Sequence, residues 1–321
     1  RARLLRDTGS RISRARRNDI WRSDVCQRDW PRQCFCDPIS FGKKWPVWSR
    51  VACRLWSMGW CGMLSKRVVA CLDVKNGELS KGVQFVATEM LGDPVAKAKA
   101  YYEDGLDELV FYDITASSDQ RNIMLDVVQS VAQEIFIPFS VGGGIRTLED
   151  AAGLLMAGAE KISLNSAAVL RPELIKECAQ AIGAQNTVLS MDVRAVAPNT
   201  ACPSGYEVVI NGGRKAMGMD AIAWARRGCE LGAGEVVVNS IDADGMKQGY
   251  EIQLTRMVAE AIPVPVVASG GAGTPEHLHQ VLTKGKADAA LVASMVHYGD
   301  YRVLDIKQYL NRQGVKVRMN Y

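Results

Sequence analysis

The stretch RVVACLDVK, from Arg67 to Lys75, is an almost wholly apolar run that reaches one carboxylate, Asp73, near its end. A short Val-rich run of this kind is typical of a strand buried on both faces in a parallel sheet. The pattern returns as TVLSMDVR, from Thr187 to Arg194, with Asp192 in the matching place. Two matching strands that each end on an acid predict a fold that places these two carboxylates opposite each other.

The rest of the chain repeats with nearly one offset. Three pairs of equivalent positions define it: Glu108 and Glu235 (127 residues), Gly143 and Gly271 (128), and Asn165 and Ala293 (128). The offset from Asp73 to Asp192 is shorter, at 119 residues, and a longer segment after the fifth strand accounts for the difference. A repeat near half the length of the body predicts two (βα)₄ units.

Eight strands are expected to alternate with eight helices from residue 67 onward. The strands are expected at 67–75, 108–113, 138–141, 160–164, 187–192, 235–239, 264–268 and 288–292. Asp93-Pro94 is a helix start signal, and the segment 76–92 before it is expected to be a polar loop. Two such half-barrels close as one (β/α)₈ TIM barrel of the usual size. A doubly wound open sheet is the alternative fold, but it gives no reason for the two-fold repeat.

Composition divides the 321 residues into two parts. Residues 1–62 hold 14 Lys+Arg against 5 Asp+Glu and six of the seven Trp, whereas residues 63–321 hold 25 against 30. Residues 1–62 are therefore expected to be a basic, Trp- and Cys-rich extension that is disordered or does not belong to the native fold. Residues 63–321 are expected to form the barrel domain.

Several partner classes have little support in the sequence. No apolar run reaches the roughly 18 residues needed to cross a bilayer, and the Cys residues of the body lack the spacing of a disulfide framework, so we expect a cytoplasmic protein without a membrane partner. The acidic body gives no reason for nucleic-acid binding, although the basic extension leaves that alternative open. The three His have no ligand spacing, and neither a metal nor a cofactor is expected.

The active site of a (β/α)₈ barrel lies at the carboxyl ends of its strands. Strands one and five face each other across such a barrel, so Asp73 and Asp192 are expected to point into one cavity from opposite sides. Two separated carboxylates can hold different protonation states, as general acid and base catalysis requires. The alternative is that each Asp is a cap or turn residue, and the duplicated position favours function.

Glycine-rich turns after the strands predict phosphate binding. Gly142-Gly143-Gly144 after strand three is paired with Asn165-Ser166 after strand four, and Gly270-Gly271 after strand seven with Ala293-Ser294 after strand eight. Such turns bring backbone N–H groups close to a phosphate, and a following helix N-terminus favours its charge. Two such sites predict a substrate with two phosphates.

Further polar residues stand at both ends of the barrel. Asp113 and Thr115 follow strand two at the level of the site, and Lys81 in the first loop is either a charge clamp over the substrate or a solvated side chain. At the other end, four strands begin with a charged residue: Arg67, Glu108, Lys161 and Glu235. If these four point inward they must pair, either as a structural ring of salt bridges or as a polar gate.

With these residues in place, the chain from Met63 to Tyr321 resembles the cyclase subunits of imidazole glycerol phosphate synthase, lyases of histidine biosynthesis. Five motifs carry the resemblance: Ala70–Val74, Asp113–Ser117, Val141–Ile145, Ser269–Gly273 and Gly314–Arg318. It implies that ammonia from a separate glutaminase subunit, bound as a heterodimer, attacks a bisphosphorylated phosphoribulosyl-formimino aminoimidazole carboxamide ribonucleotide. The products are imidazole glycerol phosphate and aminoimidazole carboxamide ribonucleotide.

The resemblance also implies roles for single residues. Asp73 matches the catalytic base and Asp192 the acid, and Lys81 matches a Lys of a mobile loop. The residues that match the substrate and phosphate contacts are Asp113, Thr115, Gly144, Asn165, Ser166, Gly245, Ser269, Gly271, Ala293 and Ser294. Arg67, Glu108, Lys161 and Glu235 match a gate through which ammonia enters the barrel.

Two departures from the family pattern are local. Met246 stands where Thr is more usual, and Asn211 precedes Gly212-Gly213. The sister isomerase, also a two-fold barrel with two Asp and a bisphosphorylated substrate, is the nearest alternative, and a barrel that binds the glutaminase without catalysis is another. The charged ring and the Gly314–Arg318 tail favour the cyclase over the first, and the two intact acids favour it over the second.

Overall fold

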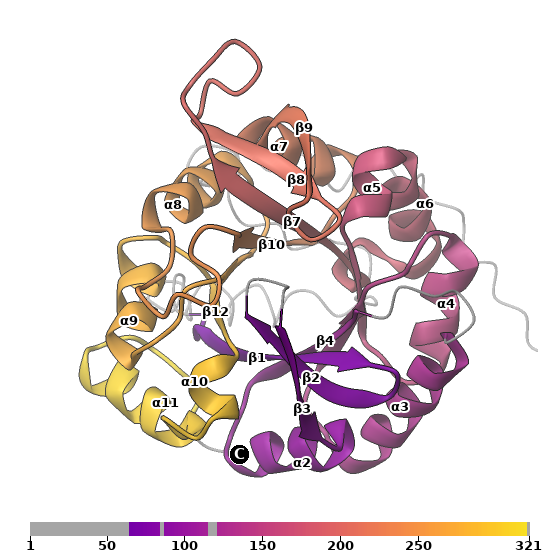
Figure 1. Cartoon of the computed structure of the whole chain (residues 1–321), viewed down its shortest axis with the longest axis vertical. Coiled ribbons are helices and arrows are strands. Elements are labelled where there is room, and N and C mark those ends of the chain that lie inside the picture. The colour runs from indigo at the N-terminus through magenta and orange to yellow at the C-terminus, as the bar shows by residue number, and fades with distance from the viewer. Residues whose placement is uncertain (1–63, 84–86, 115–120, 320–321) are drawn as a thin grey trace, which may run out of the picture. The chain divides into compact units, whose positions relative to one another are not determined.

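The computed structural model describes residues 64–83, 87–114 and 121–319 of the chain. Eight parallel strands form a closed ring: β1 (Arg67–Lys75), β4 (Glu108–Asp113), β5 (Phe139–Gly142), β6 (Lys161–Leu164), β7 (Thr187–Ala195), β10 (Glu235–Ser240), β11 (Val266–Ser269) and β12 (Ala289–Val292). Pairing of β10 with β7 and of β12 with β1 completes the ring. The predicted (β/α)₈ barrel is confirmed, and Figure 1 shows the strands inside a layer of helices.

The helices follow the strands around the outside of the ring. They are α2 (Pro94–Glu103), α3 (Arg121–Glu134), α4 (Leu148–Met156), α5 (Ser166–Leu170), α6 (Glu173–Ile182), α7 (Ala221–Leu231), α8 (Ile252–Ala261), α9 (Pro275–Thr283), α10 (Ser294–His297) and α11 (Val303–Arg312). A short 3-10 turn, Ala184–Asn186, precedes β7. The start predicted at Asp93-Pro94 is confirmed, since Asp93 caps α2 by accepting hydrogen bonds from the backbone N–H of Val95 and Ala96. None of the helices in the described ranges is long and apolar enough to span a membrane.

Strand alternation divides the apolar residues between two cores. On β1, Val68, Ala70 and Leu72 belong to the large core beneath the helices. Val69 and Cys71 point the other way and join a small core inside the barrel. Because neighbouring residues of a strand face opposite sides, a strand in this barrel is apolar throughout, which is why RVVACLDVK reads as an unbroken run.

The expected loop at 76–92 is wrong in part, because the chain forms a hairpin there. Strands β2 (Glu78–Val83) and β3 (Ala87–Gly92) pair antiparallel with each other, and β2 also pairs antiparallel with β1. Asn76 and Gly77 make the turn into β2 with φ of 53° and 83°. Asn-Gly is the preferred pair for a two-residue hairpin turn, since both positions need positive φ.

The second half carries a hairpin at the equivalent place. Strands β8 (Tyr206–Ile210) and β9 (Lys215–Asp220) extend from β7 in the same antiparallel manner. Figure 1 shows the two hairpins over opposite sides of the ring. The longer connection predicted after the fifth strand is therefore a hairpin built on the strand that carries Asp192, as β2 and β3 are built on the strand that carries Asp73.

The two ends of the barrel domain are held together by a buried ion pair. Lys307 of α11 is fully buried, and its Nζ lies 2.7 Å from Oδ1 of Asp107 and 2.9 Å from the carbonyl oxygen of Gly105. Burial lowers the pKa of Lys307, and the carboxylate of Asp107 acts in the opposite direction. Removal of either partner would leave the other charge buried, so this pair fixes the last helix against the first βα unit.

Candidate active site

The two candidate carboxylates stand on opposite sides of the end of the barrel where the strands finish, called the mouth below. Asp73 is on β1 and Asp192 is on β7, and four strand-to-strand steps separate β1 from β7 in either direction around the ring. Each of the two also lies where its strand pairs with its hairpin, Asp73 opposite Ser80 and Asp192 opposite Val209. The structure therefore places the two residues as the repeat predicts.

Two amide side chains hold Asp192. Asn165 Nδ2 donates to Oδ2 at 3.0 Å, and Asn239 Nδ2 donates to Oδ1 at 2.9 Å. Burial raises the pKa of Asp192 above its ordinary value, although both amides act in the opposite direction by stabilising the ionised form. A carboxyl group with a raised pKa and a fixed orientation is suited to deliver a proton.

Asp73 has different surroundings. It is less buried than Asp192, and the thiol of Cys71 lies 3.5 Å from its Oδ1. Its neighbour in register on β4 is the aromatic Tyr112, where the equivalent neighbour of Asp192 on β10 is Asn239. The two acids thus share a position in the fold while they differ in environment, which is the condition for an acid and a base in one site.

Glycine is required in both predicted phosphate turns for backbone reasons. Gly143 and Gly144 have φ of 88° and 67°, and Gly270 and Gly271 have φ of 88° and 100°. A Cβ on Gly143 would lie 2.1 Å from the carbonyl oxygen of Asp113, and one on Gly271 would lie 2.0 Å from that of Gly249. Each turn therefore packs tightly against the loop of the preceding strand.

A short helix stands behind each turn. Helix α5 begins after Asn165 and α10 begins after Ala293, and neither residue caps its helix with a side-chain hydrogen bond. Ser166 and Ser294 are the first residues of these helices, at the same place in the two halves. Ser166 Oγ also accepts a hydrogen bond from the backbone N–H of Asn211, at 3.2 Å, which ties α5 to the turn of the second hairpin.

The other predicted contact residues fall around the mouth where they can be described. Asp113 ends β4 and Ser269 ends β11, and Gly245 lies in the loop after β10 with φ of 75°. The side chain of Lys81 and the whole of Thr115 lie outside the described residues. Among the residues that are described, no three His, Cys, Asp or Glu side chains come together as a metal site.

Four charged side chains close a ring at the opposite end of the barrel. Arg67 pairs with both Glu108 and Glu235, and Lys161 Nζ lies 2.7 Å from Glu108 and 2.8 Å from Glu235. Burial alone would raise the pKa of Glu235, but the charges of Arg67 and Lys161 lower it below its ordinary value. The expected pairing of the four side chains is confirmed. These four residues are called the charged ring below.

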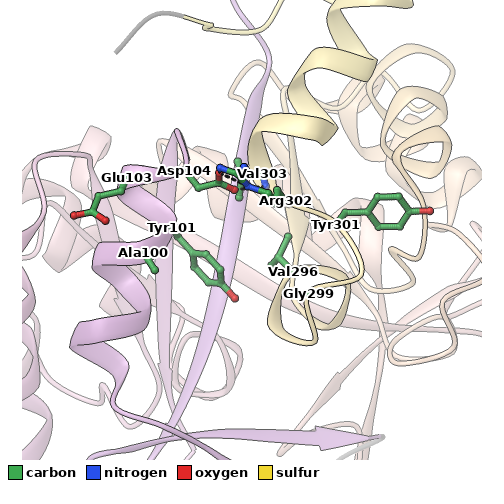
Figure 2. Close-up of a pocket in the computed structure, with 9 residues that line it drawn as sticks. All are labelled: Ala100, Tyr101, Glu103, Asp104, Val296, Gly299, Tyr301, Arg302 and Val303. Carbon is green, nitrogen blue, oxygen red and sulfur yellow. Dashed lines mark hydrogen bonds and ion pairs between the residues drawn. The ribbon is translucent and has the colours of Figure 1, made fainter.

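A surface hollow of 360 Å³ lies elsewhere and contains none of the predicted site residues. Figure 2 shows it between the end of α2 and the segment from Val296 to Val303, with Asp104 and Arg302 joined across it. Tyr101 lines it and forms a 2.6 Å hydrogen bond to Nδ1 of the buried His297. This hollow lies in the outer helical layer, not at the mouth.

Two residues near the carboxylates were missed by the sequence reasoning. Asn239, which holds Asp192, was treated only as the end of a strand, and Tyr112 was not considered. The repeat contained a signal for both, because they are separated by 127 residues, the offset of Glu108 and Glu235. A comparison of equivalent inward-facing residues at the strand ends of the two halves would therefore have paired Asn239 with Tyr112.

Two acids that face each other across the mouth of a (β/α)₈ barrel, with a charged ring at its base, place the protein in the class of (β/α)₈-barrel enzymes. Comparison with known proteins identifies the family. Residues 67–302 match the family model described as "Histidine biosynthesis protein". The chain is 60% identical over 259 residues to "Imidazole glycerol phosphate synthase subunit HisF" of Syntrophobacter fumaroxidans, covering 81% of this chain and all of that protein. The subunit of the same name from Solidesulfovibrio magneticus is 61% identical over 256 residues, 80% of this chain and 99% of that protein.

The chain therefore belongs to the HisF family of imidazole glycerol phosphate synthase subunits, which are lyases of histidine biosynthesis. The resemblance found from the five sequence motifs is confirmed. The same name accompanies a relative from Nitratidesulfovibrio vulgaris that is 59% identical over 257 residues. Family membership does not by itself assign a role to any residue of this chain, so those roles rest on the geometry of the site.

Proposed function

We propose that the barrel of this chain uses ammonia to cleave a phosphoribulosyl-formimino aminoimidazole carboxamide ribonucleotide and to close the imidazole ring of imidazole glycerol phosphate. Aminoimidazole carboxamide ribonucleotide leaves as the second product. The observation that carries the proposal is the pair Asp73 and Asp192, which face each other across the mouth in unlike environments.

Asp192 is the general acid and Asp73 the general base in this proposal. The raised pKa of Asp192 keeps more of it protonated near neutral pH than an exposed Asp, so it can protonate the departing nitrogen. Asp73 lies on the other side of the mouth and takes up protons as ammonia adds and the ring closes. Asn165 and Asn239 orient the acid and do not titrate themselves.

The substrate's two phosphates bind at opposite sides of the mouth. One lies against Gly144 and the start of α5, with Asn165 and Ser166, and the other lies against the equivalent turn and helix, with Gly245, Gly271, Ala293 and Ser294. The positive φ values of the turn glycines and the uncapped starts of α5 and α10 support this placement. Asp113, Ser269, Lys81 and Thr115 complete the substrate contacts.

Ammonia reaches the mouth from below, through the charged ring, and comes from a separate glutaminase subunit in a heterodimer. Three strongly exposed apolar residues support a docking surface at that end: Leu64 (94% exposed), Phe136 (81%) and Met156 (84%). They precede β1, β5 and β6, so all three lie where strands begin. These are the three most exposed large apolar side chains among the described residues, and apolar side chains exposed at the same end of a barrel suit an interaction surface.

The catalytic domain is residues 63–321, and residues 1–62 are not needed for catalysis. We place the protein in the cytoplasm. The alignment length supports this boundary. The Syntrophobacter relative aligns over its whole length with 259 residues of this chain, and 259 is also the number of residues from Met63 to Tyr321. Residues 1–62 lie outside the described residues.

Turnover with ammonium and no glutaminase tests the proposal directly. The full chain and a version starting at Met63 are each supplied with the bisphosphorylated ribulosyl substrate and an ammonium salt, and loss of the formimino absorbance is followed. Equal turnover by both supports the cyclase and the domain boundary. Tight substrate binding without turnover would contradict the cyclase, and turnover of the preceding aldose substrate would favour the sister isomerase.

A further inference from the structure

One aromatic side chain lies across the inside of the barrel just below the carboxylates. Tyr112 is the last but one residue of β4 and is in register with Asp73 on β1, and its hydroxyl lies 3.3 Å from Ser190 Oγ. Ser190 is on β7, three strands further around the ring, so the phenol ring passes in front of β5 and β6. The side chain packs against the small apolar core inside the barrel.

Gly142 shows that the fold makes room for this ring. Gly142 is the first of the three glycines after strand three, and unlike Gly143 and Gly144 it does not have a positive φ. A Cβ at this position would lie 2.6 Å from Cε1 and 2.7 Å from Cδ1 of Tyr112. A Cβ would also lie 3.0 Å from Cβ of Ser163. The phenol makes the closest contacts, so the glycine is explained mainly by the position of Tyr112 and not by the turn.

Tyr112 separates two regions of the barrel interior. Below it, the inward residues are mainly apolar, and Val69, Val110, Val188 and Val237 stand between it and the charged ring. Beside it, Ser190 and Asp192 lie on one strand, so the phenol hydroxyl meets β7 one inward position below the acid. A neutral molecule that moves up through the apolar interior along β7 meets the Tyr112 hydroxyl before it meets Asp192.

Burial raises the pKa of the Tyr112 phenol above its ordinary range, with the Ser190 and Ser163 hydroxyls acting in the opposite direction. The hydroxyl is therefore a neutral donor at neutral pH. A neutral phenol offers one hydrogen bond to an ammonia molecule and does not convert it to ammonium.

We propose that Tyr112, anchored by Ser190, is an inner gate that controls the passage of ammonia from the barrel interior into the active site. This inference rests on the proposed function. To pass, ammonia takes the place of one hydroxyl in the Tyr112–Ser190 hydrogen bond and is held by the other hydroxyl as the phenol moves aside. Tyr112 is a positioning residue for the nucleophile and takes no part in proton transfer.

The test compares two routes for ammonia in the complex of the full chain with its glutaminase. Glutamine-driven turnover requires passage through the barrel, whereas added ammonium reaches the site from the open mouth. Tyr112→Phe and Ser190→Ala each remove a hydroxyl that would bind ammonia during its passage. Each should therefore lower the ratio of glutamine-driven to ammonium-driven turnover by about fivefold, the equivalent of one hydrogen bond. Glutamate formed per imidazole product should rise in step, because released ammonia escapes.

A double substitution separates gating from a loss of structure. Gly142→Ala pushes its new methyl group into the phenol and should lower the same ratio. In a Tyr112→Ala background there is no ring to displace, so Gly142→Ala should then have no further effect. Independent effects of the two substitutions, an unchanged ratio, or equal losses by both routes would each overturn the gate.

The outcome is distinguishable from failure of the proposed function. If the unaltered chain shows no ammonium-driven turnover, the cyclase assignment fails before any variant is compared. If the unaltered complex works with both nitrogen sources and the variants keep its ratio, only the gate is wrong.

Discussion

The two halves of this barrel place an aspartate at the same point and surround it differently. Asp192 lies between Asn165 on the preceding strand connection and Asn239 on the next strand, and both donate to it. The positions equivalent to these two are occupied by Ala293, which follows β12, and by Tyr112 of β4, which is in register with Asp73. Both amides donate to Asp192, whereas the equivalent positions of the repeat hold an alanine and a tyrosine.

This difference shows which features the internal repeat preserves. Both halves keep the strand, the hairpin behind the acid, the Gly turn and the short helix, all of which set positions. The residues that set proton affinity have diverged. A symmetric scaffold with asymmetric neighbours lets one carboxyl hold a proton while the other accepts one, as an acid and base pair requires.

The largest effect is expected from removing either acid. Asp73→Asn and Asp192→Asn keep the shape of the side chain and remove its proton chemistry, so each should lower ammonium-driven turnover by about 10²–10⁴-fold. Substrate affinity, measured by calorimetry, should change little because the phosphates provide most of the binding. Comparable turnover in one of the two variants would show that its aspartate is only a turn residue and would end the two-acid interpretation.

The charged ring at the other end of the barrel is also unequally shared between the halves. Glu108 and Glu235 are equivalent, but the position equivalent to Lys161 is Ala289. Arg67 is in register with Ala289 and supplies the missing positive charge. Arg67 therefore completes the ring, although its position is not the one that the repeat makes equivalent to Lys161.

Breaking the ring should have the next largest effect. Lys161→Ala leaves Glu108 and Glu235 with one cation instead of two, and should destabilise the fold by about 2–4 kcal/mol because both carboxylates are buried. If the ring is a gate, glutamine-driven turnover should change more than ammonium-driven turnover.

An exposed ion pair provides the matched control for Lys161. Lys286→Ala removes a pair with Glu260 that is open to solvent, and should cost less than about 1 kcal/mol without altering either turnover. Urea unfolding and the two turnover assays measure both variants. Equal changes by the two nitrogen routes in Lys161→Ala would reduce the ring to a structural feature.

Removal of one amide from Asp192 tests the comparison between the acids most directly. Asn239→Ala removes a donor that stabilises ionised Asp192, so the pKa of Asp192 should rise further. Because a general acid must be protonated, the alkaline fall in kcat should move to higher pH. Loss of orientation should also lower kcat by about tenfold.

Free ammonia must be held constant in this pH profile, since its own protonation otherwise dominates the result. Tyr112→Phe is the matched control, because it alters the equivalent position of the other half and leaves both amides on Asp192. An alkaline limb that stays in place in Asn239→Ala would mean that Asp192 is not the group that titrates.

The sequence predicted the barrel because apolar runs and a constant offset report strands and repetition. It also predicted the placement of Asp73 and Asp192 on opposite sides of the mouth and the pairing of the charged ring, since strand order alone brings strand ends together. The hairpin at 78–92 was read as a loop although Asn76-Gly77 signals a two-residue turn. The repeat offset relates Asn239 to Tyr112, but their contacts could not be obtained from it, because these depend on where side chains point inside a closed ring.

The smallest effect is expected at the helix caps, where the halves can be compared by stability alone. Asp93 and Asp220 are 127 residues apart and cap α2 and α7. Asp93 is exposed, whereas Asp220 is buried and also accepts a hydrogen bond from the backbone N–H of Ser204. Asp93→Ala should cost about 1 kcal/mol and Asp220→Ala about 2 kcal/mol at neutral pH.

The pH dependence of the second cap has a definite sign. Burial alone would raise the pKa of Asp220, but its hydrogen bonds with Ser204, Ala223 and Ile222 lower it below the ordinary value. A carboxyl with a lowered folded-state pKa contributes stability above its unfolded pKa of about 3.9 and loses it as the pH falls through the folded value. The cost of Asp220→Ala in urea unfolding should therefore shrink below about pH 4. Asp220→Asn, which keeps an acceptor oxygen without the charge, should cost less than Asp220→Ala at neutral pH, and equal costs would show that the charge and not the hydrogen bonds caps α7.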